Sequence, residues 1–193
     1  QELGIKFNRE KITIIPWARL YHSIQHEQLS AGFSMANTTE REALFKLVPL
    51  PLVAKTSIMV LEERKKQLLK IDVNDLVIAV VRDDVGQLRL NNANISAKQI
   101  ETTSAVSMLK MLMHQRVDAV AYAEDVAYFQ YKKLALTKGT LVPIYVLEDK
   151  SLASYAFHKN TPICITDLFA KTINLLHQRG ELSQIKDKYI QNE

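Results

Sequence analysis

The feature that most constrains the fold is a regular alternation of strand-like and helix-like segments in the middle of the chain. Short apolar runs such as 76–81 (LVIAVV) are separated by segments whose apolar residues recur at helical spacing. The predicted strands are 76–81, 95–102, 117–122 and 141–147, and the predicted helices between them are 85–90, 104–114 and 124–134. Strands that alternate with helices predict a parallel sheet with right-handed crossovers. We therefore expect an α/β fold.

The front of the chain follows other patterns. Residues 1–8 resemble the end of a helix closed by Gly4, and a proline ends the β-branched run KITII. The segments predicted next are a strand at 11–15, an amphipathic helix from Trp17, a strand from 29, an irregular or edge segment with two prolines at 44–52, a strand at 56–61 and a charged turn or short helix at 62–69.

The end of the chain turns wholly helical after a strand at 152–157. Thr166 is a candidate N-cap for a helix that Gly180 closes, and an amphipathic turn or two follows. Helices with no strand after them must pack on a sheet formed earlier. The front segment, which lacks helical cover, supplies that sheet.

Polar residues follow the predicted strand that starts at 29. Leu29, Ala31, Phe33 and Met35 alternate with smaller or more polar neighbours, which indicates a half-buried strand. In open α/β sheets, ligands bind at the carboxyl ends of strands. Arg41 follows that end, and its planar guanidinium fits a carboxylate through two parallel hydrogen bonds.

A second interpretation of the same stretch needs no ligand. Thr38 would cap a short helix, and Arg41 would pair with Glu40, Glu42 or another nearby acid. The stretch alone leaves both interpretations open.

Composition excludes several classes of protein. The 193 residues are 47% apolar and 24% charged, and the net charge of +4 is scattered rather than gathered on one segment, so nucleic-acid binding is not indicated. No apolar run approaches the ~18 residues of a membrane span. No signal peptide is recognisable, so we expect a mature form, an excised domain or a cytoplasmic protein.

The usual signatures of nucleotide and hydrolase sites are absent from the sequence. Only five glycines occur, without G-x-G-x-x-G, P-loop or G-x-S-x-G patterns, and no cofactor is implied. Cys164 lies among apolar residues and is expected in the core. His22 and His26 are one helical turn apart but lack a nearby third metal ligand, so we expect a solvated face and no metal.

Five motifs in order resemble one known family. They are Pro16-Trp17-x-Arg19, FSMANTTERE, Phe45-Lys46, VVRDD and Arg116-Val117-Asp118. From about residue 3 to 190 the chain is similar to the bacterial family 3 extracytoplasmic solute-binding proteins, the amino-acid-binding components of ABC importers. The likeness is greatest to a branch with P-W-x-R and S-M-x-x-T-x-x-R-E signatures.

The resemblance implies a two-lobed periplasmic binding protein-like fold of type II. Each lobe would be a mixed or mostly parallel sheet flanked by helices, and two hinge strands would join the lobes. Lobe 1 would comprise 1–60 and 157–193, lobe 2 would comprise 62–155, and the hinges would lie near 57–61 and 155–158. Such a protein binds an amino acid or related carboxylate in the periplasm, passes it to a membrane ABC permease, and is not an enzyme.

In lobe 1 the resemblance implies a site around Arg41, which matches the arginine that holds the ligand's α-carboxylate. Ser34 matches a residue that helps to hold the same group. Ala36 stands where many relatives have serine, so only its backbone N–H could serve. Thr38 belongs to the same motif, and Trp17 is a further candidate, although it could instead fasten its helix to the sheet.

In lobe 2 the resemblance implies two contact points. Asp84, Val85 and Gly86 stand near the family's G-T-[TS] turn, where a helix N-terminus presents N–H groups to the carboxylate. The two aspartates at 83 and 84 would repel an anion there. The acid that binds the ligand's ammonium corresponds to Ala123, with Glu124 and Asp125 beside it.

The front of the chain departs from the family pattern. Relatives begin with a central lobe-1 strand, a ligand-stacking aromatic residue and a full first helix, whereas this chain starts at the tail of that helix. Unpaired strand groups are costly, so we expect a re-paired sheet, a removed segment or a second chain that completes lobe 1.

Three other functions remain open. The same fold serves as the sensory ligand-binding domain of membrane receptors, and a degenerate relative would bind nothing. A cyclohexadienyl-dehydratase-like enzyme would need acid–base groups, for which Glu124, Asp125 and His158 are the candidates.

Overall fold

The chain divides into two compact units of α/β structure. The computed structural model describes residues 12–134 and 140–190. Unit 1 comprises the chain up to Leu52 and from Leu152 onward, and unit 2 comprises Val53–Ser151. The lobe borders that the resemblance implies, near 60 and 157, stay a prediction.

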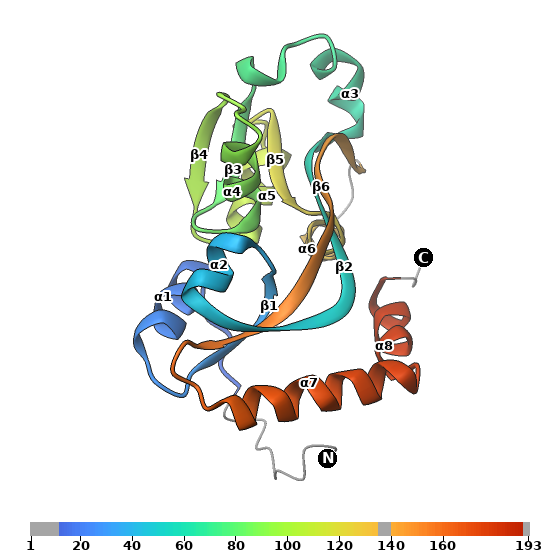
Figure 1. Cartoon of the computed structure of the whole chain (residues 1–193). Helices are drawn as coiled ribbons and strands as arrows, with labels where there is room; N and C mark the ends of the chain where they lie inside the picture. Colours follow the sequence, from blue (N-terminus) through green and yellow to red (C-terminus); the bar gives the residue numbers. More distant parts are fainter. Residues whose placement is uncertain (1–11, 135–139, 191–193) are drawn as a thin grey trace. The chain divides into compact units, whose positions relative to one another are not determined.

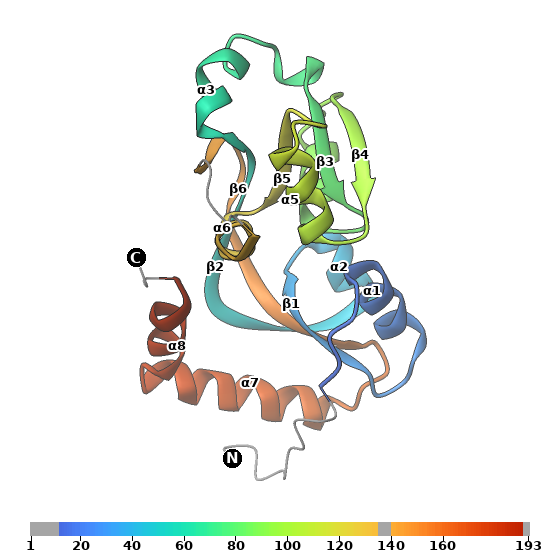
Figure 2. The same cartoon turned by 180° about the vertical axis from the view of Figure 1, so that it is seen from behind.

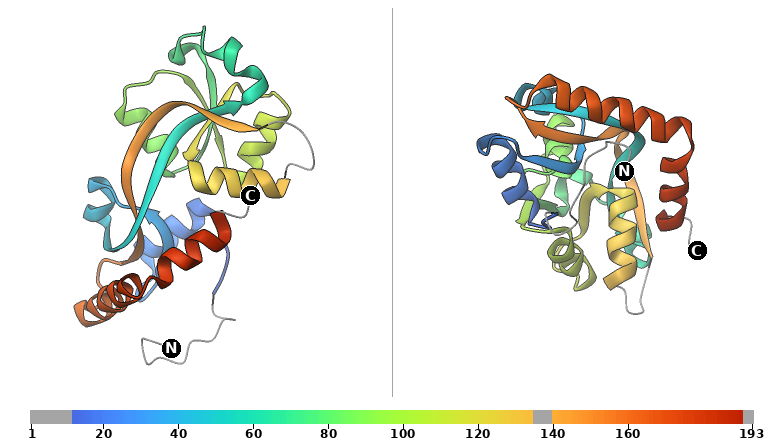
Figure 3. Two further views of the ribbon diagram at one scale, coloured as in Figure 1. Left: turned by 90° about the vertical axis from the view of Figure 1, so that its right-hand side faces the viewer. Right: turned by 90° about the horizontal axis from the view of Figure 1, so that it is seen from below.

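Two long strands belong to both units. β2 spans Phe45–Leu61 and β6 spans Leu141–His158. They are neighbours in a sheet with the order β1-β6-β2-β5-β3-β4, and Figure 3 shows β2 in cyan beside β6 in orange. The sequence predicted an irregular or edge segment at 44–52 and two separate strands at 141–147 and 152–157. The prediction of an irregular segment at 44–52 is wrong, because these residues belong to the strand β2. The prediction of two strands at 141–147 and 152–157 is also wrong, because both belong to the single strand β6.

The prolines of β2 are tolerated because of their place in the sheet. The register between β2 and β5 covers Thr56–Met59, so the Pro49 and Pro51 part of β2 has β6 as its neighbour in the sheet order. Proline removes one backbone donor, which an edge position does not need. This part of the strand is therefore an edge, as one of the two alternatives stated.

Unit 2 contains the regular strand–helix repeat (Figures 1 and 2). Its remaining elements are α3 Glu62–Leu68, the short 3-10 helix Val73–Asp75, β3 Val77–Val81, α4 Val85–Asn92, β4 Lys98–Thr102, α5 Ala105–Met113, β5 Ala119–Ala123 and α6 Glu124–Leu134. β3 pairs in parallel with both β4 and β5, whereas β5 pairs antiparallel with β2, so the sheet is mixed. The predicted α/β class is confirmed.

The core of unit 2 lies between α4 and the sheet. It gathers inward residues of three strands with Leu90 of α4, and its strand members are Ile58, Val60, Ile78, Val80, Ala119 and Ala121. Every second residue contributes, which is the period expected of strands with two distinct faces. This core positions the carboxyl ends of β3 and β5.

Unit 1 covers its part of the sheet with helices on both faces. Its other elements are α1 Trp17–His26, β1 Ala31–Ala36, α2 Thr39–Leu44, α7 Ile163–Gln178 and α8 Glu181–Ile190. One face carries a cluster around Ile24 of α1, Met35 and Ala156. The other face packs Phe157 against Ile173 of α7. The last helices therefore pack on the front segment's sheet, as predicted.

Three local predictions are wrong. Residues 12–15 form no strand, because Ile14 is 97% exposed and its β-branched neighbours meet no sheet face. Helix α7 begins after Pro162 rather than Thr166, whose hydroxyl donates to the Ile163 carbonyl oxygen inside the first turn. Cys164 is exposed, because α7 turns its first residues away from the sheet. The helix end predicted at 1–8 lies outside the described residues.

Candidate functional site

Thr38 caps the short helix α2 and so positions Arg41. The Thr38 backbone is extended, and its Oγ1 accepts a hydrogen bond from the Arg41 backbone N–H at 3.3 Å. Glu40 and Glu42 lie in the first turn, where negative charge is favourable. The cap that the second interpretation proposed for Thr38 is therefore present.

The guanidinium of Arg41 is buried against two aromatic rings. Arg41 is only 2% exposed, and its Nη1 donates to the Ala36 carbonyl oxygen at 3.2 Å. Its Cζ lies 5.2 Å from the centre of the Trp17 ring and 5.7 Å from that of Tyr21. A buried charge is costly unless its surroundings compensate it, and ring faces attract cations. The structure thus brings the predicted residues Trp17, Ala36 and Arg41 together, and adds Tyr21.

Ser34 lies at a β-bulge in β1. Phe33 pairs with Tyr155 and Met35 with Ser154, so Ser34 is an extra residue, and its φ of 68° is in the left-handed region. The bulge overturns the predicted alternation, because Phe33 is exposed while Met35 is buried. Bulges often re-aim a side chain beside a functional site.

In unit 2 the predicted residues gather at one sheet edge. β3 and β5 are parallel neighbours, with Ile78 opposite Ala119. Because the carboxyl ends of parallel strands share an edge, Asp84 after β3 and Glu124 after β5 belong to the same edge.

Asp84 itself occupies the N-terminus of α4. It is the N-cap residue, and its buried carboxylate accepts a hydrogen bond from the Val85 backbone N–H at 2.6 Å. The Tyr122 side chain also bonds to Asp84, and burial together with the Asp84 charge raises the pKa of Tyr122. A helix N-terminus attracts an anion, and here the chain supplies that anion.

Glu124 is likewise held by its own unit. Ser57 Oγ donates a hydrogen bond to Glu124 Oε1, and Lys55 Nζ lies 3.5 Å from the same oxygen. Asp125 follows it at the start of α6 and is half-buried. Sequence reasoning missed Tyr122, Ser57 and Lys55, because strand residues carry no local signal of such partners.

The candidate acid–base groups do not gather in one unit. His158 lies in unit 1, where its Nδ1 accepts a hydrogen bond from the Asn160 backbone N–H at 3.1 Å, whereas Glu124 and Asp125 lie in unit 2. The rings of His22 and His26 stack at 4.1 Å, but among the described residues no group of three metal-ligating side chains forms.

Replacing Asp84 by alanine should lower the free energy of unfolding by about 2–4 kcal/mol. The change removes a helix cap, worth about 1 kcal/mol, and takes a partner from the buried Tyr122 hydroxyl, which costs about 1–3 kcal/mol. Urea unfolding measures the difference.

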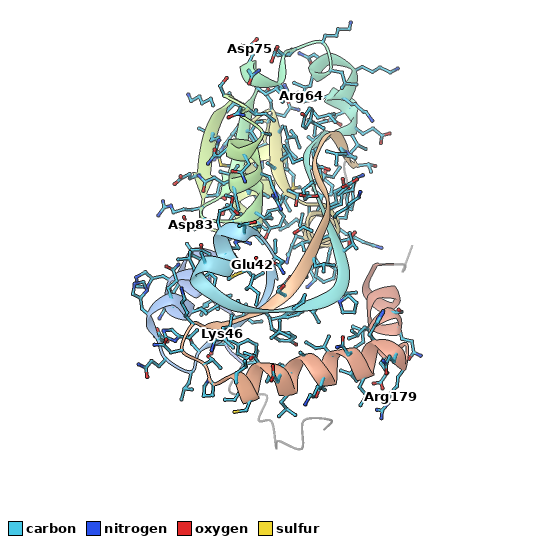
Figure 4. All side chains as sticks on the ribbon, viewed as in Figure 1. Glu42, Lys46, Arg64, Asp75, Asp83 and Arg179 are labelled. Carbon is cyan, nitrogen blue, oxygen red and sulfur yellow. The ribbon has the colours of Figure 1, made fainter. Side chains whose placement is uncertain are left out.

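The matched control is Asp83→Gly, next to it in sequence (Figure 4). Asp83 is exposed with a φ of 60°, a conformation that glycine adopts without strain, so stability should stay equal or rise slightly. Equal losses in both variants would contradict a specific role for the Asp84 carboxylate.

No protein-family model and no curated protein matches the chain, but solved structures do. An amino acid ABC transporter substrate-binding protein from Streptococcus pneumoniae Canada MDR_19A, bound to L-arginine, superposes with a TM-score of 0.82 at 19% identity, over 98% of this chain and 78% of that chain. A histidine kinase sensor domain with similarity to periplasmic binding proteins gives 0.75 at 14% identity, over 91% and 75%.

A third structure with this fold is the ancestral amino acid-binding protein AncCDT-1, a precursor of cyclohexadienyl dehydratase. Its TM-score is 0.79 at 16% identity, over 98% of this chain and 79% of that chain. The chain therefore has the fold of the amino acid ABC transporter substrate-binding proteins, and the expected resemblance is confirmed at that level. Within the described part, no helix has the length and apolar character to cross a membrane.

Proposed function

We propose that the chain binds an amino acid or a related small carboxylate outside the cytoplasmic membrane and delivers it to an ABC permease. The observation that carries the proposal is the buried guanidinium of Arg41, held at the end of β1 in a fold that amino-acid-binding proteins use. No catalytic role is part of the proposal. A second chain that completes lobe 1 would pair at β1, the terminal strand of the sheet order.

Arg41 is the proposed carboxylate anchor. Its guanidinium has a planar fork of donors that matches a carboxylate, and the surrounding rings of Trp17 and Tyr21 limit competition from water. Ser34 and the backbone of Ala36 lie at the same strand end. These residues are the proposed ligand contacts in unit 1.

The acidic edge of unit 2 favours a ligand that also carries positive charge. Asp84, Glu124 and Asp125 contribute three carboxylates there, and the α4 N-terminus already holds one of them. A second carboxylate on the ligand would meet like charge. We therefore propose a zwitterionic or cationic amino acid, and the L-arginine bound to the pneumococcal protein supports this choice.

Isothermal titration calorimetry with L-arginine, L-lysine, L-glutamine and L-glutamate tests the proposal. We expect binding of the cationic or neutral amino acids and none of L-glutamate. The absence of binding by all four at millimolar concentration would favour the degenerate, non-binding alternative.

Trp17 provides an independent optical test, because it is the only tryptophan in the chain. Its ring lies over the Arg41 guanidinium, so a carboxylate bound there should change the emission intensity or wavelength. Trp17→Phe should abolish the signal while calorimetric binding persists. Binding shown by calorimetry without any change in wild-type emission would separate Trp17 from the site.

A sensory role is the second candidate, and the kinase sensor domain with the same fold favours it. The discriminating observation is the complete gene. A membrane helix followed by a signalling domain would indicate a receptor, whereas a neighbouring permease gene would indicate import.

A further inference from the structure

Ser154 of β6 has a buried hydroxyl that needs a partner. The residue is 0% exposed, and its Oγ has no hydrogen-bond partner among the described residues. It is paired with Met35 of β1, directly beside the Ser34 bulge.

The side chain of Ser154 faces the α1 side of the unit-1 sheet. Side chains alternate along a strand, so Ser154 and Ala156 share a face. Ala156 packs in the cluster that contains Ile24 of α1 and Met35, with Trp17 beside it. The neighbouring Tyr155 packs in the opposite cluster, on the α7 side.

Arg41 lies on the same side and close to this strand pair. Its Cζ lies over the Trp17 ring, and its Nη1 bonds to the Ala36 carbonyl oxygen. Ala36 follows Met35 and pairs with Ala153, the residue before Ser154. Ser154 is therefore paired with the residue directly before the one whose carbonyl oxygen accepts the Arg41 hydrogen bond. The strand pair that carries Ser154 is thus the same pair that contacts the guanidinium.

A buried hydroxyl without a partner lowers stability, whereas alanine at the same position would leave nothing unsatisfied. The cost disappears if a bound molecule supplies an acceptor. A carboxylate has about four lone-pair sites, and a guanidinium fork uses two of them. One carboxylate can therefore accept hydrogen bonds from Arg41 and from a hydroxyl together.

We infer that Ser154 is a further ligand-binding residue, whose O–H donates to a carboxylate oxygen of the solute that Arg41 pairs with. The inference rests on the proposed function. It predicts that removing the hydroxyl leaves the free protein equally or more stable but weakens ligand binding. A serine with only a structural role would not produce both effects.

The test is Ser154→Ala, measured by thermal unfolding without ligand and by calorimetry with L-arginine, L-lysine and L-glutamine. The melting temperature of the free protein should stay equal or rise. The affinity for whichever amino acid the wild type binds should fall about tenfold, the size of one hydrogen bond to a charged group. Ser154→Cys, which fills a similar volume with a weaker donor, should also weaken binding.

Thr161→Val is the matched control. Thr161 is also buried in unit 1, and its Oγ1 also has no partner among the described residues. It differs from Ser154 in its place, because it follows β6, where its carbonyl oxygen accepts a hydrogen bond from Lys46 Nζ. This variant should retain wild-type affinity. Equal affinities of wild type and Ser154→Ala would overturn the inference but leave the proposed function intact. A lower melting temperature of free Ser154→Ala together with unchanged binding would do the same. A wild type that binds none of the three amino acids would instead contradict the proposed function, and the inference with it.

Discussion

Replacing Arg41 by methionine should abolish measurable binding of the amino acid that the wild-type protein binds. Methionine keeps much of the buried volume but removes the charge and the donor fork. Truncating one member of a buried, hydrogen-bonded charge pair costs about 2–5 kcal/mol, which corresponds to a loss of about 30-fold to several thousand-fold in affinity. Calorimetry on the folded variant measures the loss.

Two further variants separate charge from geometry. Arg41→Lys keeps the charge but loses the planar fork, so its affinity should lie between those of wild type and Arg41→Met. Arg19→Met removes a guanidinium from the exposed face of α1 and should bind normally. Wild-type affinity in a folded Arg41→Met variant would exclude Arg41 as the anchor.

Replacing Gly86 by alanine should lower the stability about as much as replacing Asp84 by alanine. A Cβ at Gly86 would collide with the backbone carbonyl oxygen of Ala121 and lie 2.6 Å from its carbonyl carbon. The obstacle is the backbone of β5 at the centre of the sheet, so α4 or the strand must shift. Overpacking of this kind costs about 1–3 kcal/mol and sometimes more, and we expect about 3 kcal/mol. That loss corresponds to a melting temperature lower by about 6–12 °C.

Gly32→Ala is the comparison that tests this explanation. Its added Cβ would meet the Ile24 Cδ1 atom and lie 3.1 Å from Leu20 Cδ1, which are the ends of flexible side chains. Those side chains can move, so the destabilisation should be clearly smaller than for Gly86→Ala. A larger loss for Gly32→Ala would show that the approach of α4 to β5 is looser than the structure indicates.

An amino acid carries a carboxylate and an ammonium group, and the residues proposed to contact it include a cation in unit 1 and carboxylates in unit 2. In unit 1 the guanidinium of Arg41 donates to the Ala36 carbonyl oxygen, and in unit 2 the carboxylates of Glu124 and Asp84 are held in place by residues of the same unit. Charged side chains that the protein already holds in place lose little conformational entropy when a ligand binds, because binding need not order them. The experiments with L-arginine and L-glutamate therefore test the charge arrangement as well as the function.

The sequence by itself determined the elements whose signals are local. The apolar period predicted β3 and the helices α4 to α6, and a single polar residue identified the cap Thr38. Gly180, with a φ of 72°, closes α7 as predicted. Such features depend on a few neighbouring residues, so the sequence shows them directly.

Only the tertiary structure decided the features that depend on strand register. The prolines of β2 left an irregular segment and an edge strand open, and the pairing of β2 with β6 decided for the edge strand. The bulge at Ser34 reversed the faces of β1, because one inserted residue shifts the alternation.

The site partners follow the same rule. Ser57 and Glu124 are 67 positions apart in the chain, and Trp17 reaches Arg41 only because α1 packs on the sheet beside α2. The sequence identified Arg41 as a candidate from its residue type and its place after a strand, and the resemblance added Asp84 and Glu124. Tertiary packing decided which groups hold each of these side chains. Hydrogen bonds and ring contacts between residues far apart in the chain produce no local or periodic pattern from which they could be predicted.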